Sequence, residues 1–232
     1  METGPILRLI YSPYFCMLGF MENILQQIDS IKGELKNSPE NSDLLNDLGV
    51  GYHLIGEYAQ AIDAFKNALS RDPDSHKIHF NLANSYFELQ QIEQAVSHYM
   101  DAIELKPDYV PAINNLADIY ELAERTEQAE ELFRHITHIN PDDPLGHFNL
   151  GNFYLRLNKT VEAGRCYQKA IELDDNFYEA YCNIGLILKH LKQYEEAIIY
   201  FTRCLEIEPQ YEPAQRDLQE CRKALINGLP GA

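Results

Sequence analysis

The sequence predicts an all-α solenoid, in which pairs of antiparallel helices stack on one another. Small, aromatic and aliphatic residues return at a fixed 34-residue period through most of the 232-residue chain, and this length suits one helix–turn–helix unit. A helix-ending position closes each unit, and it is occupied by Pro73, Pro107, Pro141, Asp175 and Pro209. The composition is 45% hydrophobic and 24% charged, which supplies enough apolar material for a substantial core.

Residues 1–20 differ in composition from the rest of the chain. Their apolar stretch is interrupted by Arg8 and Pro13 and is too short to span a bilayer. Neither the basic start nor the small-residue cleavage site of a secretory signal is clear. Two interpretations remain open: translation naturally begins at Met21, or the segment is a short apolar element that docks on the array or on a membrane.

Residues 21–41 predict a helix that caps the N-terminal end of the stack. Ile24, Ile28, Ile31 and Leu35 follow helical spacing, and Pro39 lies 34 residues before Pro73. The segment therefore resembles the second half of a repeat. Such caps cover the apolar surface at the ends of a solenoid.

Five full repeats follow, at 42–75, 76–109, 110–143, 144–177 and 178–211. In the first repeat we expect helices near Ser42–Ile55 and Tyr58–Arg71. Residues 212–227 form an amphipathic C-terminal capping helix, and 228–232 are a tail. Because the period runs unbroken, we expect one elongated array without a linker.

The repeating columns resemble those of the tetratricopeptide repeat (TPR) family. The small column is Gly49, Ala83, Ala117, Gly151 and Gly185; the alanine column is Ala61, Ala95, Ala129, Ala163 and Ala197; the aromatic column is Phe65, Tyr99, Phe133, Tyr167 and Phe201. The resemblance implies a right-handed superhelix, with the first helix of each pair lining a concave groove that binds peptides or proteins. Four departures, Ile136, Asp175, His79 and His147, are expected to loosen local packing.

A polar column is the best functional clue: Asp47, Asn81, Asn115, Asn149, Asn183 and Asp217. Asparagine is a mediocre helix former, but its amide both donates and accepts hydrogen bonds, so it suits an extended peptide backbone. The asparagine ladder resembles the repeat arm of the O-linked N-acetylglucosamine transferase. We expect a groove formed by Asn81, Asn84, Asn115, Asp118, Asn149, Asn152, Asn183, Phe80, Phe87 and Phe148. The alternative is that these amides only bridge neighbouring helices.

The charge and the groove residues narrow the class of partner. A net charge of −17 repels nucleic acid and anionic membrane surfaces, whereas a basic or neutral protein segment is compatible with it. Chaperone-binding relatives grip a C-terminal carboxylate with cationic residues. Phe80, Leu145 and Asn149 occupy those positions here, which argues against Hsp70 or Hsp90 tails as partners.

Motifs for catalysis, cofactors or metals are not evident. The pairs His76/His79 and His135/His138 lie three residues apart on a helix, but further ligands at fixed spacing are missing. Five cysteines without a CxxC spacing indicate free thiols and favour a cytoplasmic location. We therefore expect a non-enzymatic scaffold without cofactor. The alternative function is an assembly or envelope-associated protein that self-associates through Ile6–Phe20 or its outer face.

Overall fold

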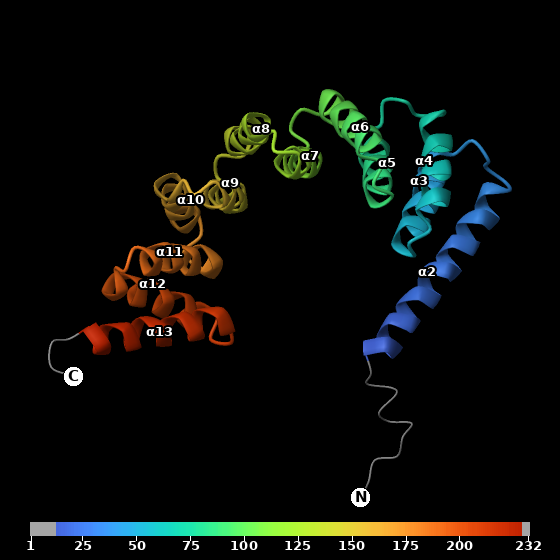
Figure 1. The fold of residues 1–232 in the computed structure, drawn as a ribbon. Helices are drawn as coiled ribbons and strands as arrows, with labels where there is room; N and C mark the ends of the chain where they lie inside the picture. Colours follow the sequence, from blue (N-terminus) through green and yellow to red (C-terminus); the bar gives the residue numbers. More distant parts are fainter. Residues whose placement is uncertain (1–12, 229–232) are drawn as a thin grey trace, which may run out of the picture. The chain divides into compact units, whose positions relative to one another are not determined.

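A computed structural model describes residues 13–228, and this part of the chain contains twelve α-helices and no β-strand (Figure 1). The all-α prediction is confirmed. The helices are α2 (Pro13–Leu35), α3 (Ser42–Leu54), α4 (Tyr58–Leu69), α5 (His76–Glu88), α6 (Ile92–Leu105), α7 (Val110–Leu122), α8 (Thr126–Ile139), α9 (Pro144–Arg156), α10 (Thr160–Leu173), α11 (Tyr178–His190), α12 (Tyr194–Ile207) and α13 (Glu212–Gly228).

The chain divides into two compact units between Ile119 and Tyr120, inside α7. In the first unit α3 contacts α4, and α5 contacts α6; in the second unit α9 contacts α10, and α11 contacts α12. The 34-residue period continues through residues 110–143, so one array without a linker stays a prediction of the sequence.

Helix α2 begins earlier than the sequence predicted. A single helix runs from Pro13 to Leu35, so residues 13–20 belong to the same helix as the predicted cap. Pro13 interrupts the apolar stretch of the sequence but not the helix, because proline is tolerated in the first turn, where its missing N–H has no intrahelical role. Ile24 and Ile28 are buried against the first repeat. The expectations for residues 1–12 lie outside the described residues.

The aromatic column packs onto the small column within each helix pair. A Cβ atom added to Gly49 would lie 2.5 Å from the Phe65 ring, and one added to Gly151 would lie 2.7 Å from the Tyr167 ring. The alanine column is fully buried. The small residues are therefore required because each ring lies directly against the helix backbone.

The turn inside each helix pair contains a residue in the left-handed conformation, always at the same position of the repeat. These residues are Gly56, Gln90, Glu124, Asn158 and Lys192, with φ between 57° and 81°. A left-handed residue at this point ends the first helix and lets the following N–H satisfy a helix carbonyl. In the second repeat, the N–H of Gln91 donates to the Tyr86 carbonyl at 2.9 Å.

The four departures from the family pattern have compensating contacts instead of looser packing. Ile136 is buried, and its methyl group lies close to the backbone of Gly146. Asp175 accepts a hydrogen bond from the Tyr181 hydroxyl at 2.7 Å and pairs with Arg203 at 2.8 Å. His79 and His147 contact the backbone carbonyls of Pro73 and Pro141. Each unusual side chain is therefore matched by a local partner.

Candidate functional site

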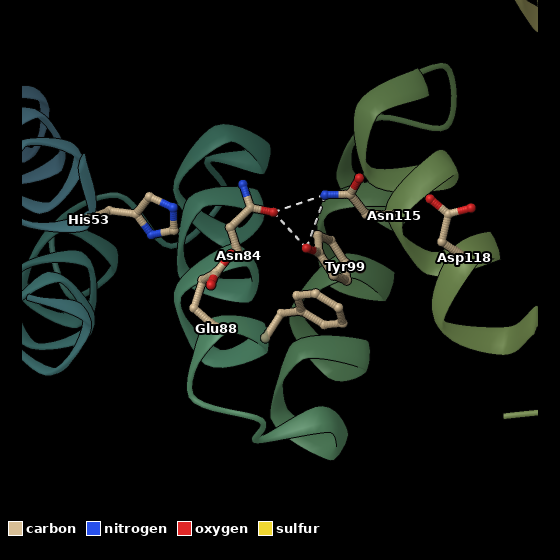
Figure 2. A pocket seen from close by; sticks show the side chains of 7 residues that line it. His53, Asn84, Glu88, Tyr99, Asn115 and Asp118 are labelled. Carbon is tan, nitrogen blue, oxygen red and sulfur yellow. Dashed lines mark hydrogen bonds between the residues drawn. The ribbon is translucent and has the colours of Figure 1, made fainter. Parts of the chain in front are cut away.

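A pocket of about 310 Å³ opens in the first unit (Figure 2). Four of its lining residues, Asn84, Phe87, Asn115 and Asp118, belong to the predicted groove. The remaining three were not in the predicted set; they are His53 on α3, Glu88 on α5 and Tyr99 on α6. The pocket thus combines helices of three successive repeats.

Asn84, Tyr99 and Asn115 form a closed hydrogen-bonded triad at the base of this pocket. The Tyr99 hydroxyl donates to Asn84 Oδ1 at 2.6 Å. Asn115 Nδ2 donates to Asn84 Oδ1 at 3.0 Å and to the Tyr99 hydroxyl oxygen at 3.1 Å. Figure 2 shows the three side chains converging from α5, α6 and α7. The triad fixes the rotation of both amides, because Asn84 takes part through its Oδ1 acceptor and Asn115 through its Nδ2 donor.

The outward ends of the two amides are complementary. Asn84 Nδ2 and Asn115 Oδ1 make no hydrogen bond to another residue of the described chain. One is a donor and the other is an acceptor, and each belongs to a residue that lines the pocket. The triad therefore presents one oriented donor and one oriented acceptor to a ligand.

Charged and titratable groups surround the triad. The exposed carboxylates of Glu88 and Asp118 lie at the pocket. Burial lowers the pKa of His53, although Glu88 opposes this effect, and His53 Nδ1 lies 2.9 Å from the Ser85 hydroxyl. Burial raises the pKa of Tyr99 to about 12, so its hydroxyl remains protonated and continues to donate to Asn84. The pocket lining therefore combines two carboxylates with a neutral hydrogen-bonded triad.

The other predicted groove residues of the first unit have structural partners. Asn81 Nδ2 donates to Asn46 Oδ1 at 2.9 Å, so Asn46, and not its neighbour Asp47, receives the ladder hydrogen bond. Phe80 packs against the rings of Tyr99 and Tyr109. Phe87 differs, because 37% of its surface remains exposed beside the triad.

The second unit repeats the triad two repeats later in the sequence. The Tyr167 hydroxyl donates to Asn152 Oδ1 at 2.8 Å, and Asn183 Nδ2 donates to the same atom at 3.1 Å. However, Glu121 and Arg156 occupy the positions equivalent to His53 and Glu88, and they form an ion pair. The charged residues near the second triad therefore differ from those near the first triad.

Two predicted groove residues of the second unit do not join its triad. Phe148 packs against the rings of Tyr167 and Phe177. Among the described residues of this unit, 120–228, Asn149 makes no side-chain hydrogen bond.

Most of the ladder amides connect consecutive repeats. Asn81, Asn115 and Asn183 each donate to an asparagine of the preceding repeat. Asp217, the last residue of the column, is buried and pairs with Lys189 at 2.7 Å. Bridging between helices therefore accounts for the polar residues inside these helices, while the pocket amides retain groups that are available for binding.

Comparison with known proteins identifies the repeats. Two family models described as tetratricopeptide repeat match the chain, one at residues 144–177 and 178–211 and the other at 56–102 and 90–147. No curated protein matches it. None of the helices described in residues 13–228 has the length and apolarity needed to cross a membrane.

Several solved structures share the fold. The C-terminal part of a TPR repeat-containing protein from Cytophaga hutchinsonii is 16% identical, with a TM-score of 0.74 over 93% of this chain and 88% of that chain. MamA is 23% identical, with a TM-score of 0.61 over 70% of this chain and 95% of that chain. YrrB, described as a TPR protein with an unusual peptide-binding site, is 15% identical, with a TM-score of 0.60 over 82% and 97%.

Proposed function

Because this chain belongs to the tetratricopeptide repeat family, whose fold supports protein–protein interaction, we propose that it binds an extended segment of a partner protein. The proposed site is the pocket of the first unit. The observation that carries the proposal is the oriented pair formed by Asn84 Nδ2 and Asn115 Oδ1.

The chemistry of this pair matches a peptide backbone. An extended segment presents carbonyl acceptors and N–H donors, which pair with an amide donor and an amide acceptor independently of the side-chain sequence. Because the triad already fixes both amides, little side-chain entropy is lost when they bind. The exposed ring of Phe87 provides an apolar contact for one side chain of the segment.

The charge of the site indicates the kind of segment. Glu88 and Asp118 lie at the pocket, and the whole chain carries a net charge of −17. An acidic peptide would be repelled by this field, whereas a basic segment would be attracted. The proposed partner segment is therefore basic or neutral. Asn149, Asn152, Asn183 and Phe148 remain proposed groove residues in the second unit.

One isosteric change tests the donor directly. Asn84→Asp keeps an oxygen that accepts from Tyr99 and Asn115 but replaces the outward Nδ2 donor with a second oxygen. The matched control is Asn67→Asp, which makes the same change in an exposed amide on α4 that does not line the pocket. Phe87→Ala tests the apolar contact. Circular dichroism would first establish that all variants retain their helicity.

Binding would be measured in two steps. The full chain is used to capture partners from native lysate, which are identified by mass spectrometry, and a peptide from a captured partner is then titrated into each variant. We expect Asn84→Asp and Phe87→Ala to weaken peptide binding, while Asn67→Asp leaves it unchanged. Equal affinity of the wild type and both pocket variants would refute the proposed site.

A second candidate function is self-association through the outer face of the second unit. A groove of about 610 Å³ lies there, and its lining includes Ile171, Ile198 and Ile199. Ile199 is 67% exposed, and exposed apolar surface of this kind favours association. Light scattering of the full chain and of Ile199→Asp tests this function, since a monomeric wild-type chain would exclude it.

A further inference from the structure

Three metal-ligand side chains converge in the second repeat, away from the triad. His79 lies on α5, and His98 and Asp101 lie on α6. His79 Nδ1 is 3.1 Å from His98 Nδ1 and 3.3 Å from Asp101 Oδ2. His98 Nδ1 is 3.2 Å from the same carboxylate oxygen. The three donor atoms therefore form a nearly equilateral triangle.

The second ring nitrogen of His79 fixes its tautomer. His79 Nε2 lies 3.1 Å from the carbonyl oxygen of Pro73. A carbonyl oxygen only accepts hydrogen bonds, so Nε2 carries the proton and, in the neutral ring, Nδ1 has a lone pair directed at the cluster. Histidines that bind metals commonly donate their other N–H to a carbonyl in this way.

A single proton does not satisfy all three atoms. If His98 Nδ1–H donates to His79 Nδ1 or to Asp101, the contact between His79 Nδ1 and Asp101 Oδ2 still brings two lone pairs together. If both rings are protonated, two N–H groups face each other across 3.1 Å. A cation between the three atoms would accept all three lone pairs at once.

The spacing fits a tetrahedral ion. Zn²⁺ binds histidine nitrogen and carboxylate oxygen at about 2.0–2.2 Å, which places neighbouring donors of a tetrahedron roughly 3.3–3.5 Å apart. The donor distance of 3.3 Å lies at the lower end of that range, and those of 3.1 Å and 3.2 Å lie just below it. We propose that His79, His98 and Asp101 bind a divalent transition-metal ion of the Zn²⁺ class, which would link α5 to α6. With Asp101 42% exposed, solvent is available as the fourth ligand.

The surroundings favour neutral, well-positioned ligands. The His98 ring stacks on Tyr86, with centroids 5.6 Å apart and an interplanar angle of 4°. Burial is the main cause that lowers the pKa of His98; His79 adds to this effect, and Asp101 opposes it. Both imidazole side chains are largely buried.

The cluster is specific to one repeat. His147 is the equivalent of His79 and makes the same contact with a proline carbonyl, but Cys166 and Lys169 occupy the positions of His98 and Asp101. The sequence analysis paired His79 with His76 on the same helix. The structure instead combines it with His98 and Asp101, which are three residues apart on the following helix.

The test is a calorimetric titration of Zn²⁺ into the full, untagged chain near neutral pH, with Mg²⁺ as a hard-cation comparison. His98→Gln and Asp101→Asn remove ligands. Glu104→Gln, an exposed carboxylate on the same helix, and His147→Gln are matched controls. We expect one Zn²⁺ per chain, affinity reduced by more than about tenfold in each ligand variant, and unchanged affinity in both controls. Zn²⁺ should also raise the unfolding temperature of the wild type but not of Asp101→Asn.

The proposal would be overturned if the wild-type chain binds no Zn²⁺, if either folded ligand variant keeps the wild-type affinity, or if a control variant loses it. Should His98→Gln lose its helicity, Asp101→Asn decides the question, because it changes a partly exposed side chain by a single atom. The result is independent of the peptide-binding proposal, whose variants do not touch these residues.

Discussion

Removing the Tyr99 hydroxyl tests whether the triad stabilises the stack. The hydroxyl belongs to a side chain that is 1% exposed, and it takes part in two hydrogen bonds, one to Asn84 and one from Asn115. A typical buried hydrogen bond contributes about 0.5–1.5 kcal/mol net, so Tyr99→Phe should lower the free energy of unfolding by about 1–3 kcal/mol. The aromatic packing stays intact, because phenylalanine occupies the same position in three other repeats.

The assay is urea denaturation followed by far-ultraviolet circular dichroism, with the stability change taken from the midpoint and slope. A double-mutant cycle isolates the triad: in an Asn84→Ala background, Tyr99→Phe should have a much smaller effect. The reverse substitution, Phe201→Tyr, should also destabilise, since it places a buried hydroxyl where Leu186 replaces the asparagine. A change of less than about 0.5 kcal/mol in Tyr99→Phe would refute the argument.

Three further predictions concern packing, a buried charge and pH. Gly151→Ala should destabilise the protein by about 1–3 kcal/mol in thermal unfolding, because the added Cβ would lie 2.7 Å from the Tyr167 ring. The control is Gly164→Ala, whose Cβ meets nothing within 4 Å and which should be neutral or stabilising in the same assay. Lys189→Met should lower the free energy of unfolding by about 1–3 kcal/mol in urea denaturation, because the carboxylate of Asp217, which is 4% exposed, loses its closest cation. An unchanged free energy of unfolding would show that the pair is not stabilising. Burial lowers the pKa of His53 below its usual 6.5, so the folded state binds fewer protons than the unfolded state. Stability should therefore fall as pH decreases from neutral through that pKa, and His53→Gln should flatten this dependence in pH-resolved unfolding curves.

The 34-residue period was sufficient to predict the fold, because the residue type at each recurring position reflects how tightly that position packs. The alignment of Gly49 with Phe65, for example, follows from a small residue and a ring at fixed spacing. The sequence places the start of the capping helix at residue 21, because the composition changes there, whereas α2 starts at Pro13.

The hydrogen-bonded triad was harder to predict, because it depends on which residues occur together at two recurring positions of the same repeat. Tyrosine occurs in the aromatic column at Tyr99 and Tyr167, where Asn84 and Asn152 lie fifteen residues earlier. Phenylalanine occurs at Phe65 and Phe201, where Val50 and Leu186 take that place. This correlation was visible in the sequence, but the aromatic column had been interpreted only as packing. The histidine cluster was missed because its members lie on two helices.

The two triads also determine which whole repeats could be removed from this chain without losing their hydrogen bonds. Removing residues 76–109 would set Asn115 beside the first repeat, where Val50 and Phe65 replace the two groups that accept its hydrogen bonds. Removing 76–143 would instead bring the sequence His147–Leu150 into the place of the identical His79–Leu82. The two-repeat deletion thus preserves this pairing, and the deletion of 76–109 loses it. Designs that shorten this chain should therefore keep a repeat that carries the equivalents of Asn84 and Tyr99 in front of each ladder asparagine that depends on them.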